Sequence, residues 1–334
     1  MTRSDPATAF WSLGTPPEGD HFMFATPFPG HENHRIAKTE DGYPSVLIRI
    51  KNEANSRPSL PVVLRYIQVN YSTEYRIRRK SGEIEEGDFA SIICKSYEHA
   101  FVRYFFATMS GLLDAIGDVP SSEVVTGLIR TLLQLFRAMA LPASRTVQGV
   151  WAELFIVATS RIRLEVARAW HSSPVDRYDF SMGTQRVEVK SSSSRERRHR
   201  FSFAQLDPPV GAHLWIASLF VERAAGGLTL SNLIDRASAG LPSDEHSRLR
   251  LLVAETLGED FEIALDRAFD AELAAESLRY YKSADIPSLA PPLPFGVSDV
   301  NFVADLSTAS PIVPHEIQSS ALLRALPEQG FAVG

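Results

Sequence analysis

The sequence predicts a mixed α/β (α+β) protein, in which an N-terminal β-rich module precedes a mixed sheet flanked by helices. Three observations predict this fold class. Strand-like segments separated by Gly, Pro, Asn and Ser dominate residues 1–95. Apolar residues then recur at intervals of three and four, the spacing of amphipathic helices. The third region combines an apolar helical segment, short strands and a continuous apolar run of strand length.

The first predicted domain is the β-rich module, residues 1–95. Its strand-like segments are residues 46–51, 61–69, 74–79 and 89–94. The module lacks an acidic cluster comparable to that of residues 153–190, so we expect it to select a target or partner rather than to carry out chemistry. Cys94, the only cysteine, rules out an internal disulfide and fits a reducing cytosol.

The second predicted domain is a helical connector, residues 96–145. Helical spacing runs from residue 97 to residue 116, and its aromatic stripe is most simply core. Ser121 or Ser122 can cap a second helix, which ends near Ala140 because Leu141-Pro142 follows.

The third predicted domain, residues 146–334, opens with an almost wholly apolar helix over residues 147–158. Glu153 lies on an apolar face of this helix, because its neighbours three and four positions away are all Gly, Val or Ile. Burying an unpaired carboxylate is costly, so Glu153 needs a charged partner or a metal. Further on, residues 213–221 are the candidate central strand, residues 229–239 and 244–257 are predicted helices, and short strands near 277–282 and 300–305 extend the sheet.

A predicted hairpin lies between these elements, at residues 177–190. Gly183 lets the chain fold back, which can bring Asp179 beside Glu188. Side chains alternate along a strand, so Glu188 and Lys190 share a face opposite the flanking valines. Two carboxylates beside an ammonium suit Mg²⁺ or Mn²⁺, with Lys190 orienting water and stabilising charge on a phosphate. An ordinary cross-strand Glu–Lys ion pair is the competing interpretation.

A helix with Glu153, a strand with Asp179 and a strand with Glu188-x-Lys190 together resemble the PD-(D/E)XK nuclease superfamily, which has the restriction endonuclease-like fold. More narrowly, the chain is similar to a bacterial family of PD-(D/E)XK members found near restriction-modification and other phage-defence genes. The narrower similarity rests on Gly149-Val150-Trp151-Ala152-Glu153-Leu154, Tyr178-Asp179-Phe180, Val187-Glu188-Val189-Lys190-Ser191 and residues 199–206. Tyr178 stands where the motif name has Pro, and Asp176 is a rival to Asp179 as metal ligand.

The resemblance implies a Mg²⁺-dependent (or Mn²⁺-dependent) endonuclease that hydrolyses DNA in a bacterial restriction or phage-defence system. Asp179 and Glu188 would hold the metal, with the Val189 carbonyl completing its shell and Glu153 binding a second metal or orienting water. Lys190 would position the attacking water. After the serines at 191–194, clustered basic residues predict a flexible loop that either attracts phosphate or is simply solvated. Gln205 matches a polar position of the family and is expected to hydrogen-bond the substrate or the site. The candidate nucleic-acid contacts are Arg195, Arg197, Arg198, His199, Arg200 and Gln205.

The charge distribution supports a nucleic-acid partner although the net charge is −6. Residues 151–200 carry ten Arg and Lys against six Asp and Glu, a local charge of +4. From residue 241 onward, fifteen acidic residues face six basic ones, so this part should point away from DNA. No apolar run is long enough to span a membrane, and the expected location is cytoplasmic.

The expected partners are DNA and other defence-system proteins, and the chain could act as a dimer. Two alternatives stay open: a catalytically inactive, nuclease-like subunit that binds DNA or protein, and an ion-pair network in an unrelated α+β protein. A titration with divalent ions separates them, because a carboxylate site should bind the ion and release protons.

Overall fold

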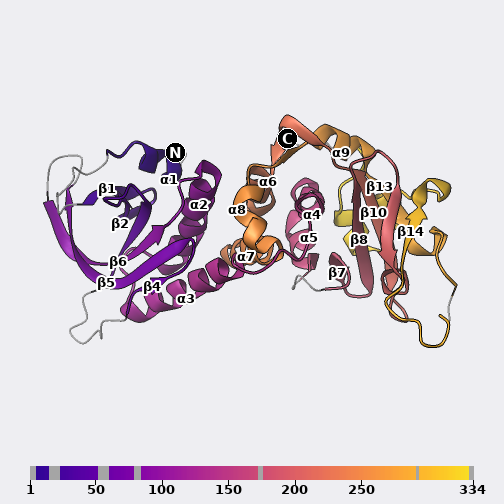
Figure 1. Cartoon of the computed structure of the whole chain (residues 1–334), viewed down its shortest axis with the longest axis horizontal. Coiled ribbons are helices and arrows are strands. Elements are labelled where there is room, and N and C mark those ends of the chain that lie inside the picture. Colours follow the sequence, from indigo (N-terminus) through magenta and orange to yellow (C-terminus); the bar gives the residue numbers. More distant parts are fainter. Residues whose placement is uncertain are drawn as a thin grey trace. The chain divides into compact units, whose positions relative to one another are not determined.

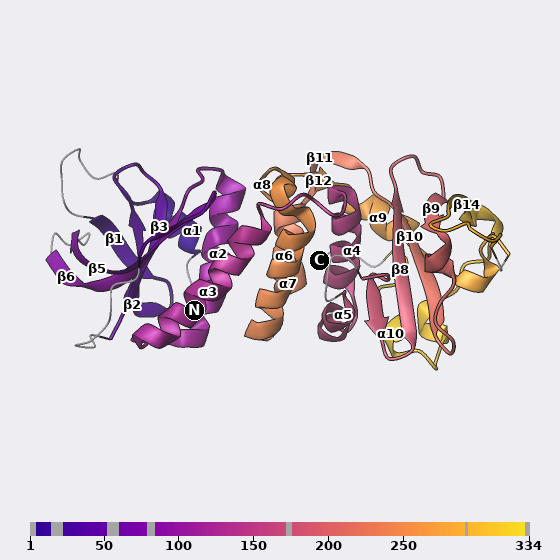
Figure 2. The ribbon, with the colours of Figure 1, turned by 60° about the horizontal axis from the view of Figure 1, so that its bottom comes forward.

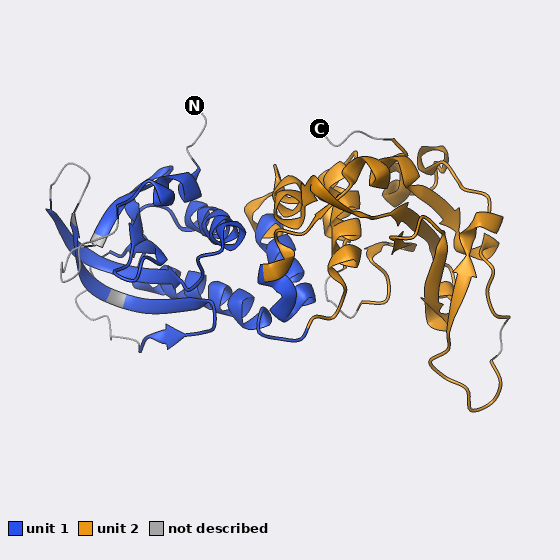
Figure 3. Cartoon of the chain, turned by 45° about the horizontal axis from the view of Figure 1, so that its top comes forward, with its two compact units in different colours: residues 1–142, 246–262 blue, residues 143–245, 263–334 orange. Residues whose placement is uncertain are grey.

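The computed structural model describes residues 5–14, 23–51, 60–78, 84–171, 176–290 and 293–330. The chain divides into two compact units, coloured separately in Figure 3. The first comprises Met1–Pro142 and His246–Glu262, and the second comprises Ala143–Glu245 and Ile263–Gly334. Most of the predicted connector, residues 96–145, thus lies in the first unit, together with residues 246–262 from the predicted third domain.

A six-stranded sheet forms the β-rich part of the first unit. Its strands follow the order β1 (Met23–Phe28), β2 (His31–Lys38), β3 (Pro44–Arg49), β6 (Ile84–Cys94), β5 (Ile67–Arg78) and β4 (Val62–Val63). A further parallel pairing of β1 with β5 closes the sheet on itself. The predicted strands at 46–51 and 89–94 fall in β3 and β6, whereas the predicted strand at 61–69 covers β4 and the start of β5, and the one at 74–79 is the end of β5. The sequence prediction missed β1, β2 and the short helix α1 (Pro6–Trp11).

Two long helices follow in this unit, α2 (His99–Ile116) and α3 (Ser122–Ala138). Their apolar stripes are buried, which confirms the helical periodicity; Phe101 of α2 contacts Phe136 of α3 edge-on. The Ser121 side chain accepts a hydrogen bond from the Val124 N–H and caps α3.

The second unit is built on a four-stranded mixed sheet (Figure 1). The strand order is β13 (Arg279–Lys282), β10 (His213–Phe220), β8 (Gln185–Ser192) and β7 (Phe180–Met182). Strands β8 and β10 are parallel, and the outer pairings are antiparallel. The apolar run at residues 213–221 is therefore a central strand, as its composition predicted.

A separate antiparallel pair, β9 (Arg198–Ser202) and β14 (Asn301–Asp305), covers one face of this sheet. Figures 1 and 2 show β14 on one side of β8 and β10, and α4 (Val147–Thr159) and α5 (Arg163–Ala169) on the other. Phe201 of β9, Ile216 of β10 and Ala304 of β14 share a buried core. Two expectations are corrected: residues 198–200 belong to a strand rather than a flexible loop, and β14 pairs with β9 instead of extending the main sheet.

The remaining helices and strands complete the second unit and the segment that returns to the first. They are β11 (Arg223–Thr229), α6 (Leu230–Ser238), α7 (Ser243–Leu257), α8 (Phe261–Ala264), β12 (Ala268–Phe269), α9 (Ala271–Ser277) and α10 (Ala321–Ala325). The predicted helices at 229–239 and 244–257 are confirmed as α6 and α7. Within the described residues, no helix is both long and apolar enough to cross a membrane.

Candidate active site

Glu153 lies at the centre of a buried hydrogen-bond network. Thr146 caps α4 through the Gly149 N–H, and the helix then carries Glu153 into the interior, where the residue is 3% exposed. Glu153 Oε1 pairs with Arg145 at 2.7 Å. Glu153 Oε2 accepts a hydrogen bond from Trp170 Nε1 at 2.8 Å and lies 3.1 Å from His171 Nε2. The carboxylate therefore has the charged partner that its position required.

The backbone near β7 brings Trp170 and His171 to Glu153. Trp170 forms an isolated antiparallel bridge with Phe180, the first residue of β7. The His171 N–H donates to the Asp179 carbonyl at 2.8 Å. The end of α5 is thus tied to the segment that carries Asp179, which places these side chains and Asp179 in one cluster.

Asp179 occupies the position where β7 stops pairing with β8. Gly183, with φ of +55°, forms the turn of this hairpin, and Phe180 pairs with Val187. Beyond that pair, Asp179 Oδ2 accepts the Val189 N–H at 2.7 Å, and Asp179 Oδ1 is bonded to Arg145. The N–H and C=O of one strand residue point the same way, so the Val189 carbonyl faces the same edge.

Glu188 contacts two polar side chains through a single oxygen. Its Oε1 accepts hydrogen bonds from Lys190 Nζ at 2.8 Å and from Gln205 Nε2 at 2.7 Å. Its Oε2 is buried without a hydrogen-bond partner among the described residues. Glu188 is opposite Ile216 in the parallel register and Lys190 is opposite Ser218, so both point toward the face that β9 covers.

Burial and mutual charge shift the acids of this cluster in different directions. Burial, reinforced by the charge of Glu153, raises the pKa of Asp179 to about 6 against the opposing effect of Arg145. Burial and the charge of Asp179 raise the pKa of Glu188 to about 8. Burial also acts to raise the pKa of Glu153, but the His171 hydrogen bond and Arg145 outweigh it and lower that pKa below its ordinary value. Glu153 is thus the carboxylate most firmly held in its charged form.

A comparison with protein families finds that one family model, described as "Putative PD-(D/E)XK family member, (DUF4420)", matches residues 24–307. The chain belongs to this family. Membership indicates a nuclease-like protein and confirms the fold class expected from the motifs. Comparisons with curated proteins and with solved structures found no match.

The structure brings the acids and the lysine of the PD-(D/E)XK pattern together. Asp179, Glu188 and Lys190 lie around the end of β7, and Glu153 reaches the same cluster through Arg145. Asp176, the rival ligand, is half-buried, and its neighbours Pro174 and Val175 fall outside the described residues. The contacts with Arg145 and Val189 are made by Asp179, which favours it over Asp176.

Two of the predicted nucleic-acid contacts instead hold the fold together. Arg197 donates to the carbonyls of Ser218 and Ser277, and its guanidinium lies over the ring of Phe220. His199 is buried with Nε2 2.8 Å from Ser218 Oγ; burial, with the charges of Lys190 and Arg197, lowers its pKa to about 4. We correct their expected role, because neither side chain is available to a phosphate without breaking these contacts.

The other predicted contacts divide into exposed and internal residues. Arg198 and Arg200 are exposed, whereas His199 and Phe201, which alternate with them, are buried, so β9 presents its arginines on one face. Arg195 is exposed but paired with Glu222, its Nη2 lying 3.0 Å from Oε2. Gln205 faces Glu188 and lies in the cluster, not on the surface expected to meet DNA.

Sequence reasoning did not identify Arg145, Trp170 or His171. The buried position of Glu153 signalled that a partner was needed but not which one. Arg145 lies just before the helix cap and matches no motif, and Trp170 and His171 depend on the bridge to β7. Only the folded chain shows these contacts.

The donor set fits a divalent cation of the magnesium type. Carboxylate and carbonyl oxygens are hard ligands, and the chain supplies them from Asp179, Glu188 and Val189 at one edge of the sheet. The buried, unpartnered Glu188 Oε2 is an unused ligand atom of this kind. Glu153 fits less well, because Arg145, Trp170 and His171 already surround its oxygens.

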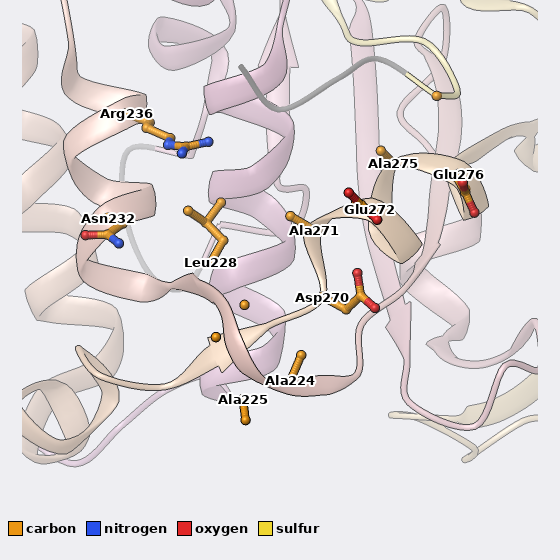
Figure 4. Close-up of a pocket in the computed structure, with 13 residues that line it drawn as sticks. Ala224, Ala225, Leu228, Asn232, Arg236, Asp270, Ala271, Glu272, Ala275 and Glu276 are labelled. Atoms are coloured by element: carbon orange, nitrogen blue, oxygen red, sulfur yellow. The ribbon is translucent and has the colours of Figure 1, made fainter.

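Two further features of the described chain carry no ligand assignment. His31, His34 and Asp118 in the first unit have ligand atoms within 4.8 Å of one another. However, His34 Nε2 lies 2.8 Å from the Gly117 carbonyl and His34 Nδ1 accepts the Arg49 N–H, so both ring nitrogens are engaged. In the second unit, a cavity of about 810 Å³ lies between α6 and α9, as Figure 4 shows. Glu153, Asp179 and Glu188 do not line it.

Proposed function

We propose that this protein is a divalent-metal-dependent nuclease that hydrolyses DNA phosphodiester bonds, in a bacterial restriction or phage-defence system. Membership of the PD-(D/E)XK-like family supports the nuclease class. The observation that carries the proposal is the grouping of Asp179, Glu188 and Lys190 at the end of β7, with Glu188 Oε2 buried and unpartnered. A cluster of like charges that disfavours its own ionisation is a feature of functional sites.

Each residue of the cluster has a distinct role in this proposal. Asp179, Glu188 and the Val189 carbonyl would hold Mg²⁺ or Mn²⁺, which supplies charge neutralisation at a phosphate and activation of water. Lys190, 2.8 Å from Glu188 Oε1 and half-buried, orients the attacking water and stabilises the charge that develops on the phosphate. Gln205 fixes the orientation of the Glu188 carboxylate.

Glu153 does not contact the reacting atoms in this proposal and acts through its neighbours. Its oxygens hold Arg145 in place and are themselves fixed by Trp170 and His171. We propose that it positions Arg145 and Asp179 rather than binding metal directly. The exposed Arg198 and Arg200 of β9 would contact DNA phosphates.

A cleavage assay tests the proposal directly. Supercoiled plasmid, linear duplex, single-stranded DNA and RNA are each incubated with the protein and Mg²⁺ or Mn²⁺, and cleavage is compared with that in a chelator. We expect metal-dependent cleavage of DNA that is abolished in the Glu188→Ala/Lys190→Ala protein. Calorimetric binding of Mg²⁺ or Mn²⁺ is measured in parallel. Absence of both cleavage and metal binding would overturn the proposal.

One observation favours a second candidate, a nuclease-like protein that binds DNA or a partner protein without cutting it. Arg145 already pairs with two acids of the cluster, so their charges are partly compensated without a metal. In that case, the wild type would bind DNA equally well with and without chelator. The Glu188→Ala/Lys190→Ala protein would bind DNA with the same affinity, and neither protein would cleave it.

A further inference from the structure

Arg145 lies where two acids of the candidate site converge. One guanidinium nitrogen, Nη1, contacts both Glu153 Oε1, at 2.7 Å, and Asp179 Oδ1. Both acids are buried, at 3% and 1% exposure. A single positive group therefore provides the counter-charge for carboxylates from the helix and from the hairpin.

Arg145 and a divalent cation would compete for the same electrostatic position. Asp179 Oδ2 accepts the Val189 N–H, and Oδ1 is bonded to Arg145, so a cation on either oxygen would share this carboxylate with the guanidinium. Two positive groups on one desolvated carboxylate repel each other strongly, because the interaction is poorly screened in the interior. A cation bound by Asp179 and Glu188 therefore requires the guanidinium to leave Oδ1.

The surroundings of Arg145 permit such a movement. Its side chain is 23% exposed, whereas its two partners are almost fully buried, so it has a route toward solvent. Arg145 precedes Thr146, the cap of α4. The cap is a hydrogen bond from the Gly149 N–H to Thr146 Oγ1, and the Arg145 side chain takes no part in it. The guanidinium can therefore move without undoing the helix that carries Glu153.

We propose that Arg145 is a built-in counter-cation of the metal-free site, which a divalent cation must displace from Asp179 in order to bind. This inference rests on the proposed function, because it assumes that Asp179 and Glu188 take a metal. The metal affinity of the chain is then reduced by the free energy needed to break the Arg145–Asp179 contact. Arg145 sets the cation concentration at which the site is loaded.

Metal binding in the absence of nucleic acid tests this role. Mg²⁺ and Mn²⁺ affinities are measured by calorimetry for wild type, Arg145→Gln and Arg145→Lys. We expect Arg145→Gln to bind Mn²⁺ at least about tenfold more tightly than wild type, since one competing charge is removed. Arg168→Gln is the matched control: it removes the same charge from a surface pair with Glu245, and its affinity should stay within about twofold of wild type.

A measurement on the unaltered side chain covers the case in which Arg145→Gln does not fold. The protein is labelled with ¹⁵N-arginine, and the Arg145 side-chain resonance is assigned by its absence from Arg145→Lys. Titration with Mg²⁺ should shift this resonance as the metal binds, while the Arg168 resonance stays in place.

The possible outcomes separate the two proposals. A moving Arg145 resonance together with tighter binding by a folded Arg145→Gln would support the displacement. A moving resonance is sufficient where Arg145→Gln does not fold, and metal binding by an Arg145 variant alone would also support it. If wild type binds metal while the Arg145 resonance does not move, or if a folded Arg145→Gln binds no more tightly, the displacement is refuted and the nuclease proposal survives. If neither wild type nor any Arg145 variant binds metal, the displacement is refuted, and the nuclease proposal fails with it when the cleavage assay is also negative.

Discussion

Gln205 links the Glu188 carboxylate to the short helical turn that follows β9. Its Nε2 donates to Glu188 Oε1 at 2.7 Å, and its Oε1 accepts the Ser202 N–H at 3.1 Å. In return, Ser202 Oγ accepts the Gln205 N–H, so the two residues form a capping box around Phe203–Leu206. The side chain of Gln205 therefore both caps a local turn and orients an acid of the candidate site.

Substitutions at these two residues separate the local role from the site role. Gln205→Ala should lower metal affinity and DNA cleavage by about 10- to 100-fold, because residues that orient a metal ligand typically contribute that much. Ser202→Ala disrupts the capping box but keeps the contact with Glu188, and should change both quantities only slightly. Calorimetry and the cleavage assay measure the difference. Equal losses in the two variants would show that Gln205 acts only through the turn.

Glu188→Gln tests whether the acidic cluster is costly without metal. Glutamine keeps an acceptor for Lys190 and Gln205 but removes the repulsion from Asp179. We expect the metal-free variant to be at least as stable as wild type, and the stabilisation by Mg²⁺ to disappear. Thermal melting in chelator and in Mg²⁺ measures both effects. A loss of about 3 kcal/mol or more would instead identify Glu188–Lys190 as a structural ion pair.

The exposed arginines of β9 should contribute to DNA affinity by neutralising phosphates. Replacing Arg198 and Arg200 by Ala together should make the negative slope of log K against log salt shallower by about 1.8, or about 0.9 for each phosphate that is no longer neutralised. Fluorescence anisotropy with duplex DNA at several salt concentrations measures the slope. Arg161→Ala/Arg168→Ala, which removes two exposed arginines from surface pairs with Glu328 and Glu245, is the control and should leave the slope unchanged. An unaltered slope in the β9 variant would remove this strand from the interface.

Periodicity predicted the elements with long, one-sided apolar patterns and missed those without them. Helices α2 and α3 and strand β10 were predicted because each buries a continuous stripe or run. Strands β1 and β2 were missed, since polar residues such as His34 and Arg35 are buried in β2 by hydrogen bonds that no local pattern reveals. Strand β9 was mistaken for a loop, because its arginines alternate with only two buried residues.

The acids of the site were predictable, but their counter-charge was not. Hairpin geometry and strand alternation placed Asp179, Glu188 and Lys190 together from local sequence. The same reasoning named Lys190 as the positive group beside these acids. It omitted Arg145, whose contact with Asp179 spans 34 residues and depends on the packing of α4 against β8. For this reason, neutralising Asp179 is a less clean test than neutralising Glu188, because it also removes a partner of Arg145.

His199 should make the stability of the fold depend on pH. In the folded chain, burial first, and then the charges of Lys190 and Arg197, lower its pKa from 6.5 to about 4, while Asp305 opposes this effect. Above pH 6.5, the imidazole is neutral in both the folded and unfolded states. Between pH 6.5 and 4, the unfolded chain takes up a proton that the folded chain excludes, so stability falls as the pH falls.

A non-titrating replacement, His199→Gln, isolates this contribution. At pH 5, the excluded proton should cost wild type about 2 kcal/mol relative to pH 8, because each unit of pH below 6.5 costs about 1.4 kcal/mol until the folded pKa is approached. Glutamine can retain a hydrogen bond with Ser218. The difference in unfolding free energy between His199→Gln and wild type at pH 8, where His199 is neutral, measures any loss of packing. Urea unfolding of both proteins from pH 8 to pH 5 should show a smaller decrease for His199→Gln, by about 2 kcal/mol. Parallel curves would mean that His199 takes up a proton as readily in the folded chain as in the unfolded one, and its buried contact with Ser218 would then have to open within this pH range.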